Sequence, residues 1–315
     1  MLVSERVCHH VFRFKQGGAA LILFVSLLLL VAITAFFTNF DSSQYMIERQ
    51  KITTQALAEA KAALTGRAIM DSNHPGSLPC PDNDDDGSAE LFIGNNCPTY
   101  IGRLPWRTLG TGDLRDAYGE RLWYALSRNH RDHSSAQPIN LNTPSTLTID
   151  GVVDYEAVVF SAGPPLSDQS RPSNQVSDYL EGENANGDDV YTVLVGSNAN
   201  DTLTTISRSE LMDKVALRIL REIRGSSTQG LIHYYNTGGN NYPFADIDGD
   251  GISNADGLTG TPSYQDLLNQ SLFFEDDTKE MLIDNGWLPH INYSIAVDKQ
   301  TVILGLGVNE LVVVP

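Results

Sequence analysis

The pattern of apolar and polar positions predicts a long N-terminal helix followed by a mixed region. Residues 19–37 (AALILFVSLLLLVAITAFF) carry no charge. From Ser43 to Met70 apolar residues recur every three or four positions, the period of an amphipathic helix. His74-Pro75-Gly76 ends this pattern, because proline and glycine break helices. We therefore expect one continuous helix over residues 19–74.

Beyond this helix, apolar runs of strand length alternate with loops rich in Gly, Pro, Asp and Asn. A capping box at Ser207 and Glu210 predicts a helix that ends near Arg224. The expected strands are 122–126, 155–162, 291–297, 302–306 and 310–314, and the expected short helices are 263–274 and 278–285. This order of helices and strands predicts an α+β protein.

The chain is strongly acidic, with 39 acidic and 21 basic residues and a formal net charge of -18. Binding phosphates needs basic surface, so the composition argues against nucleic acid as a partner. It fits a carboxylate-rich protein that binds divalent cations, and an acidic surface kept for solubility is the alternative. The sequence contains no Walker loop or dinucleotide fingerprint and gives no positive case for an enzyme.

Two loops carry aspartates at alternate positions before a glycine, as calcium loops do. Alternate side chains can converge on one ion, and the glycine permits a sharp turn. Calcium is therefore the expected cofactor, with a solvated acidic turn as the alternative at each loop. The expected ligands of the first loop are Asp82, Asp84, Asp86, Ser88 and Glu90, and those of the second are Asp246, Asp248, Asp250, the Ile252 carbonyl, Asn254 and Asp256.

The three cysteines lie on both sides of the uncharged run. Cys8 precedes it, whereas Cys80 and Cys97 follow it and are close together. Two neighbouring cysteines after the run and a single cysteine before it fit a chain that passes from a reducing to an oxidising compartment. The sequence predicts a Cys80–Cys97 disulfide, and two free buried thiols are the alternative.

The uncharged run is long enough to predict one membrane span. Arg6, Arg13 and Lys15 precede it, and Asp41 follows it. Positive-inside bias then predicts a cytoplasmic N-terminus and a head on the other side.

The junction at residues 15–22 (KQGGAALI) resembles the prepilin cleavage site of bacterial type IV pilins and type II secretion pseudopilins. The resemblance implies cleavage by a prepilin peptidase after Gly18, which makes Ala19 the new, N-methylated N-terminus. Leu23 stands where most major pilins carry glutamate, so the site looks more like that of minor pilins and tip pseudopilins.

Two head motifs extend the resemblance. Residues 116–124 (DAYGERLWY) are similar to the strand entry of pseudopilin heads. Residues 181–191 resemble the acidic loop that binds calcium in such heads, and Asp188 and Asp189 are the best-matched positions.

The resemblance implies a pilin-like α+β fold, with a long helix packed on an antiparallel β-sheet head and an additional α/β lobe. The implied parts are a leader (1–18), a transmembrane and assembly helix (19–38), an amphipathic pilin helix (39–74), a β head (75–206) and a C-terminal lobe with a calcium loop (207–315).

The function implied by the resemblance is that of a minor pilin or pseudopilin, a single-pass inner-membrane protein with its head in the periplasm or in an extracellular fibre. Its implied partners are other pilins or pseudopilins, bound through the N-terminal helix, together with the prepilin peptidase and the inner membrane. Two alternatives remain: a signal-anchored periplasmic hydrolase or binding protein, and a calcium-dependent adhesin displayed on a pilus.

Overall fold

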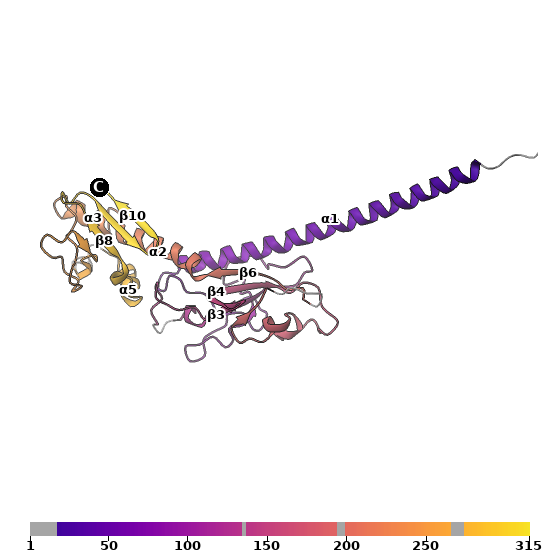
Figure 1. The fold of residues 1–315 in the computed structure, drawn as a ribbon. Helices are drawn as coiled ribbons and strands as arrows, with labels where there is room; N and C mark the ends of the chain where they lie inside the picture. Colours follow the sequence, from indigo (N-terminus) through magenta and orange to yellow (C-terminus); the bar gives the residue numbers. More distant parts are fainter. Residues whose placement is uncertain (1–17, 134–136, 194–198, 266–273) are drawn as a thin grey trace, which may run out of the picture. The chain divides into compact units, whose positions relative to one another are not determined.

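The computed structural model describes residues 18–133, 137–193, 199–265 and 274–315. The chain forms two compact units, Met1–Lys51 and Ile52–Pro315. The first helix, α1 (Ala19–Met70), belongs to both (Figure 1). Apart from Gly18, the predicted leader lies outside the described residues.

Helix α1 is continuous, as the sequence predicts, and ends four positions before the expected residue 74. Every side chain of residues 20–35 is exposed. Within the second unit, the helix buries Ala56, Ala60, Leu64 and Ala68, which are spaced by four and therefore share one face.

The predicted membrane placement is wrong. A span needs about 20 consecutive apolar residues, and none of the helices in the described part of the chain is long and apolar enough to cross a membrane. This finding corrects the expected single-pass inner-membrane topology, with its cytoplasmic N-terminus and its head on the far side.

The first sheet is built around the long central strand β4. Its strands are β1 (Ile101–Arg103), β2 (Trp123–Leu126), β3 (Leu147–Ile149), β4 (Val152–Ser161), β5 (Val190–Tyr191) and β6 (Thr202–Ser207). Their order is β1-β2-β4-β3-β5, and β6 pairs with β4. All pairs are antiparallel except β3 with β5, which corrects the expectation of a purely antiparallel head.

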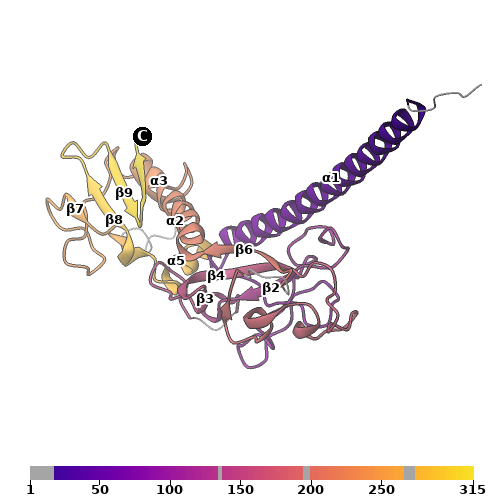
Figure 2. The ribbon, with the colours of Figure 1, turned by 45° about the vertical axis from the view of Figure 1, so that its right-hand side comes forward.

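The second sheet is antiparallel and lies in the C-terminal lobe (Figure 2). Its order is β10-β9-β8-β7, with β7 (Thr259–Gly260), β8 (Asn292–Ile295), β9 (Val302–Leu306) and β10 (Asn309–Val313). The lobe also contains α2 (Arg208–Arg224), α3 (Gly230–Thr237) and α5 (Asp276–Asp284). The helix expected at 263–274 lies largely outside the described residues.

Short 3-10 turns complete the described structure: η1 (Arg128–His130), η2 (Val176–Asp178), η3 (Gly182–Ala185) and η4 (Leu288–His290). One apolar core joins the buried face of α1, the inner faces of both sheets and α2. A second core covers the opposite face of the first sheet and includes Trp123, Phe160 and Tyr179. These elements confirm the α+β class.

Candidate metal-binding loops

The loop at residues 246–252 brings three carboxylates together. Oxygen atoms of Asp246, Asp248 and Asp250 all lie within 4.8 Å of one another. Asp246 is buried, whereas Asp248 and Asp250 are exposed. Carboxylate oxygens are the ligands that calcium prefers, so this group has the chemistry of a calcium site.

Asp246 is held as a carboxylate. Its Oδ1 accepts the N–H of Gly249 and its Oδ2 accepts the N–H of Gly251, each at 2.7 Å. Burial alone would raise the pKa of Asp246, but the hydrogen bonds from Gly251 and Gly249 outweigh it, so the pKa lies below its usual range. The carboxylate of Asp246 therefore stays charged at neutral pH, as a metal ligand must.

Of the predicted acidic ligands of this loop, Asp256 does not join the group. Asn254 Oδ1 accepts the N–H of Ile247 at 2.6 Å, just as the carboxylate of Asp246 accepts backbone N–H groups. The N–H of Ile252 donates to Asp250 Oδ1 at 2.8 Å. Asp256 has a positive φ of 66° and is not among the three clustered carboxylates of the described residues.

The loop at residues 82–88 gathers Asp82, Asp84 and Asp86, whose oxygen atoms also lie within 4.8 Å of one another. Here burial raises the pKa of Asp82, and the negative charges of Asp84 and Asp85 add to the effect. The pKa of Asp86 is lowered by the hydrogen bonds that Ser88 donates. A cation in this loop would relieve the repulsion around Asp82.

The other predicted ligands of this loop serve its own backbone. Glu90 Oε1 accepts the N–H of Asn83 at 3.0 Å, and the N–H of Ser88 donates to Asp86 Oδ1 at 2.6 Å. The three clustered carboxylates of Asp82, Asp84 and Asp86 are the candidate ligands that the structure brings together.

The acidic pair at residues 188 and 189 does not form a metal group. Asp189 is paired with Arg128 at 2.6 Å, and Asp188 Oδ1 accepts the N–H of Val190 at 3.1 Å. Among the described residues, no third ligand joins them. The arginine provides the positive charge that the resemblance assigns to calcium.

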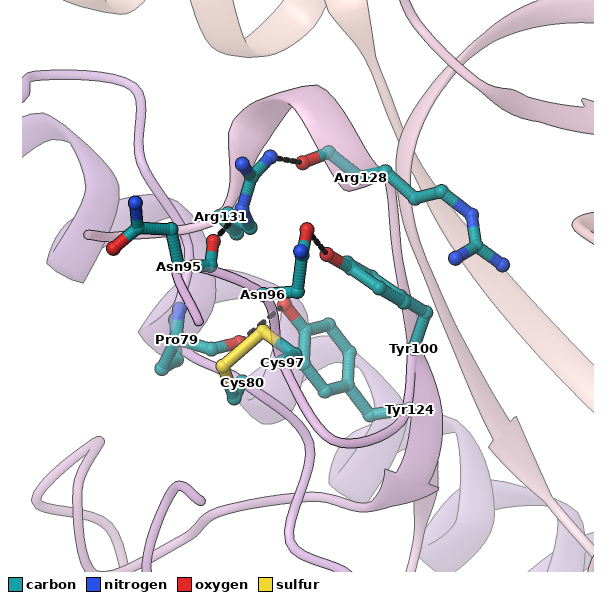
Figure 3. Close-up of a disulfide and its surroundings, with 9 residues drawn as sticks. All are labelled: Pro79, Cys80, Asn95, Asn96, Cys97, Tyr100, Tyr124, Arg128 and Arg131. Atoms are coloured by element: carbon teal, nitrogen blue, oxygen red, sulfur yellow. Dashed lines mark hydrogen bonds between the residues drawn. A yellow bond between two sulfur atoms is a disulfide. The ribbon is translucent and has the colours of Figure 1, made fainter. Parts of the chain in front are cut away.

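The first loop directly follows a disulfide. Cys80 and Cys97 are bonded, with their Cα atoms 5.5 Å apart. Figure 3 shows the bond beside Tyr124, whose hydroxyl donates to the Pro79 carbonyl at 3.2 Å. The cross-link ties the start of the loop to a segment 17 residues later.

Sequence reasoning did not find a third acidic group, formed by Asp71, His74 and Asp132. Arg67 lies between its two carboxylates, at 2.6 Å from Asp71 and 3.2 Å from Asp132. Because one guanidinium is paired with both acids, the group is an ion-pair network and a poorer cation site than the two aspartate loops. The nearby His130 is buried against Glu156, with Nδ1 and Oε2 2.5 Å apart.

At the predicted processing site, α1 begins at Ala19, and Gly18 is an exposed turn residue.

No protein-family model, curated protein or solved structure matches the chain.

Proposed function

We propose that the chain is a minor pilin or pseudopilin: a structural subunit, without catalysis, that joins other pilin-like subunits through the first part of α1. The observation that carries this proposal is the uniformly exposed apolar surface of residues 20–35. Leu21, Phe24 and Leu28 are 67%, 61% and 53% exposed. Removing such surface from water stabilises by about 25 cal/mol per Å², so partner helices with similar surfaces are favoured.

The second part of the same helix also supports the proposal. Ala60, Leu64 and Ala68 are fully buried in the core that α1 shares with the first sheet. A helix whose first part exposes apolar side chains and whose second part packs on a β-sheet head is the arrangement that the prepilin-like junction implies.

The start of the helix agrees with the proposed processing. Cleavage after Gly18 would leave Ala19, the first residue of α1, as the N-terminus. The mature chain would then begin within the helix that it uses for assembly.

Calcium is the proposed structural ion of the two aspartate loops. In each loop three carboxylates lie within 4.8 Å of one another, and like charges at such distances repel. A bound calcium ion would convert this repulsion into order, because binding to the folded state stabilises it.

Cysteine cross-linking tests the helix contact. In a Cys8→Ser background, Leu28→Cys places a thiol on the exposed helix, and Val297→Cys, at a position 81% exposed, places the control thiol on the C-terminal lobe. We expect a bifunctional maleimide added to producing cells to link the Leu28→Cys chain to another subunit and to leave the control monomeric. Monomers from both variants would contradict the proposal.

A further inference from the structure

The C-terminal lobe repeats the plan of the N-terminal head. We infer that residues 207–315 are a second head of the same kind as residues 52–206, so that one assembly helix carries two interaction modules. Only the description of the two copies as pilin-type heads rests on the proposed function; the repetition itself rests on the contacts below.

A shared order of four strands occurs in both copies, and the first sheet also contains β3 and β5, which have no counterpart in the four-stranded second sheet. Strand β4 pairs with β2 along one edge and with β6 along the other, and β1 flanks β2. Strand β9 likewise pairs with β8 and β10, and β7 flanks β8. Each set is preceded by a helix that shares its core, α1 in the first copy and α2 in the second.

The register is the same as well. One row of directly paired residues crosses each sheet and passes through a glycine, a buried tyrosine and an apolar residue. In the first sheet this row is Gly102, Tyr124, Val159 and Thr204; in the second it is Gly260, Tyr293, Leu304 and Leu311.

Each aspartate loop is joined to its sheet by the same backbone bridge. Asp82 exchanges two backbone hydrogen bonds with Arg103, at 2.9 and 2.6 Å. Asp246 exchanges the same two bonds with Thr261, at 3.0 and 2.9 Å. Arg103 and Thr261 each follow the glycine of the shared row.

The internal hydrogen bonds of the loops match position by position. The first aspartate accepts the N–H groups three and five residues later, at 2.8 and 2.7 Å for Asp82 and at 2.7 Å twice for Asp246. In both loops the second residue donates its N–H to the side chain seven positions later, which is Glu90 in one copy and Asn254 in the other.

In both copies a buried tyrosine donates a hydrogen bond to the carbonyl of a proline that precedes the aspartate loop. The hydroxyl of Tyr124 donates to the Pro79 carbonyl at 3.2 Å, and that of Tyr293 donates to the Pro243 carbonyl at 2.7 Å. Each proline stands three residues before the first aspartate of its loop. Two Asp-rich turns that arose independently would not be expected to share the same strand position, the same proline and the same tyrosine hydrogen bond.

The glycine at the sixth loop position is packed alike. Gly87 has φ +89°, and a Cβ there would lie 2.5 Å from the ring of Trp106. Gly251 has φ +87°, and its Cβ would lie 2.6 Å from the ring of Tyr264. An aromatic ring therefore covers the turn in both copies, and only glycine fits beneath it.

The copies differ in their connections and in their helices. Helix α2 directly follows β6 and has no apolar extension like that of α1. The second head therefore has no assembly helix of its own and is attached through the first. Its sheet also has short β8–β9 and β9–β10 connections. Ile303 of β9 is exposed, whereas a second core buries its counterpart Val158 in the first sheet.

Loop exchange in the full-length chain tests the equivalence. Residues 246–252 are replaced by the seven residues of 82–88 (DNDDDGS), and the control receives the same seven in reverse order. Hydrogen exchange of β7 and β8 is the readout, because these strands depend on the bridge at Asp246. We expect wild-type protection with the exchanged loop and at least tenfold faster exchange with the reversed loop. Equal loss of protection in both would overturn the inference.

Matched hydroxyl deletions give a second test with variants that fold. Tyr124→Phe and Tyr293→Phe each remove one buried hydrogen bond to a proline carbonyl, so each should lower the folding equilibrium constant by about three- to tenfold. Tyr45→Phe, at an exposed position, is the neutral control. A costly change at one tyrosine with none at the other would also overturn the inference. Both tests use a single chain, so failure of subunit assembly does not affect them.

Discussion

The first aspartate of each loop differs in role from the two that follow it. Asp82 and Asp246 are each 1% exposed and accept two backbone N–H groups. The later aspartates of each loop are solvent-accessible, and they add negative charge within 4.8 Å of the first. The backbone of the loop therefore holds the first carboxylate in place, while the other two lie exposed beside it.

We expect calcium to bind at both loops and to raise the melting temperature of the protein. An ion present at 100 times its Kd adds about 2.7 kcal/mol per site to the free energy of unfolding. Changing Asp248 and Asp250 together to Asn removes two charged ligands, so calorimetric titration should fall from two ions per chain to one.

The matched control for this titration is Asp168→Asn with Asp298→Asn, because both acids are exposed and lie outside the loops. It should leave the stoichiometry at two. Wild-type protein whose melting temperature is the same in calcium and in chelator would refute calcium binding.

Asp201 is a partly buried acid that lies against a second acid. The N–H of Glu181 donates to Asp201 Oδ2 at 3.0 Å, and the N–H of Asp201 donates to Glu181 Oε2 at 3.3 Å. Burial, together with the negative charge of Glu181, raises the pKa of Asp201 from 3.8 to about 7. Between pH 3.8 and about 7, Asp201 is therefore protonated in the folded protein and ionised in the unfolded chain.

This proton predicts a pH dependence of stability. Between the unfolded pKa of 3.8 and the folded pKa of about 7, the free energy of unfolding should fall as the pH rises, and Asp201 should add no further slope above that window. Urea unfolding at about pH 5 and about pH 8 measures the difference. Asp201→Asn should flatten it, while the exposed control Asp168→Asn should not; equal slopes in all three proteins would contradict the assignment.

At this scale the sequence predicted which residues carry charge but not what they contact. The alternating aspartates follow from the local pattern, and the structure clusters them. The contact of Asp189 with Arg128 depends on β3 lying beside β5, a pairing between segments far apart in the chain. The use of Asn254 by the backbone of its own loop also required the folded turn.

Among the elements, those with strong local signals were predicted correctly. Helix α1 has an unbroken helical period. Helix α2 begins at Arg208, directly after its N-cap residue Ser207, whose Oγ accepts the N–H of Glu210 at 3.2 Å, as the capping box indicates. The strands β1, β3, β5, β6 and β7 were not predicted. Strands β3, β5 and β6 are stabilised by pairing with β4 and with one another. The register between segments that are distant in the chain cannot be predicted from the hydrophobic period alone.

At the scale of the whole molecule, the repeated head was not visible in the sequence because few residues specify it. The prolines, the loop aspartates and the buried tyrosines recur, while the connections between the strands change length. The equivalence became visible through shared contacts, such as the tyrosine hydroxyl on the proline carbonyl. Two heads on one helix give the proposed subunit more contact surface than a single head provides.

The central claim is that this chain is processed and assembled as a pilin-class subunit. Mass spectrometry of the N-terminus, after co-production with a prepilin peptidase, tests it most directly. We expect a chain that begins at N-methylated Ala19, an uncut chain when Gly18 is changed to Val, and normal cutting in the control Ser4→Ala. A wild-type chain that keeps Met1 in the presence of active peptidase, or one cut at another residue, would contradict it.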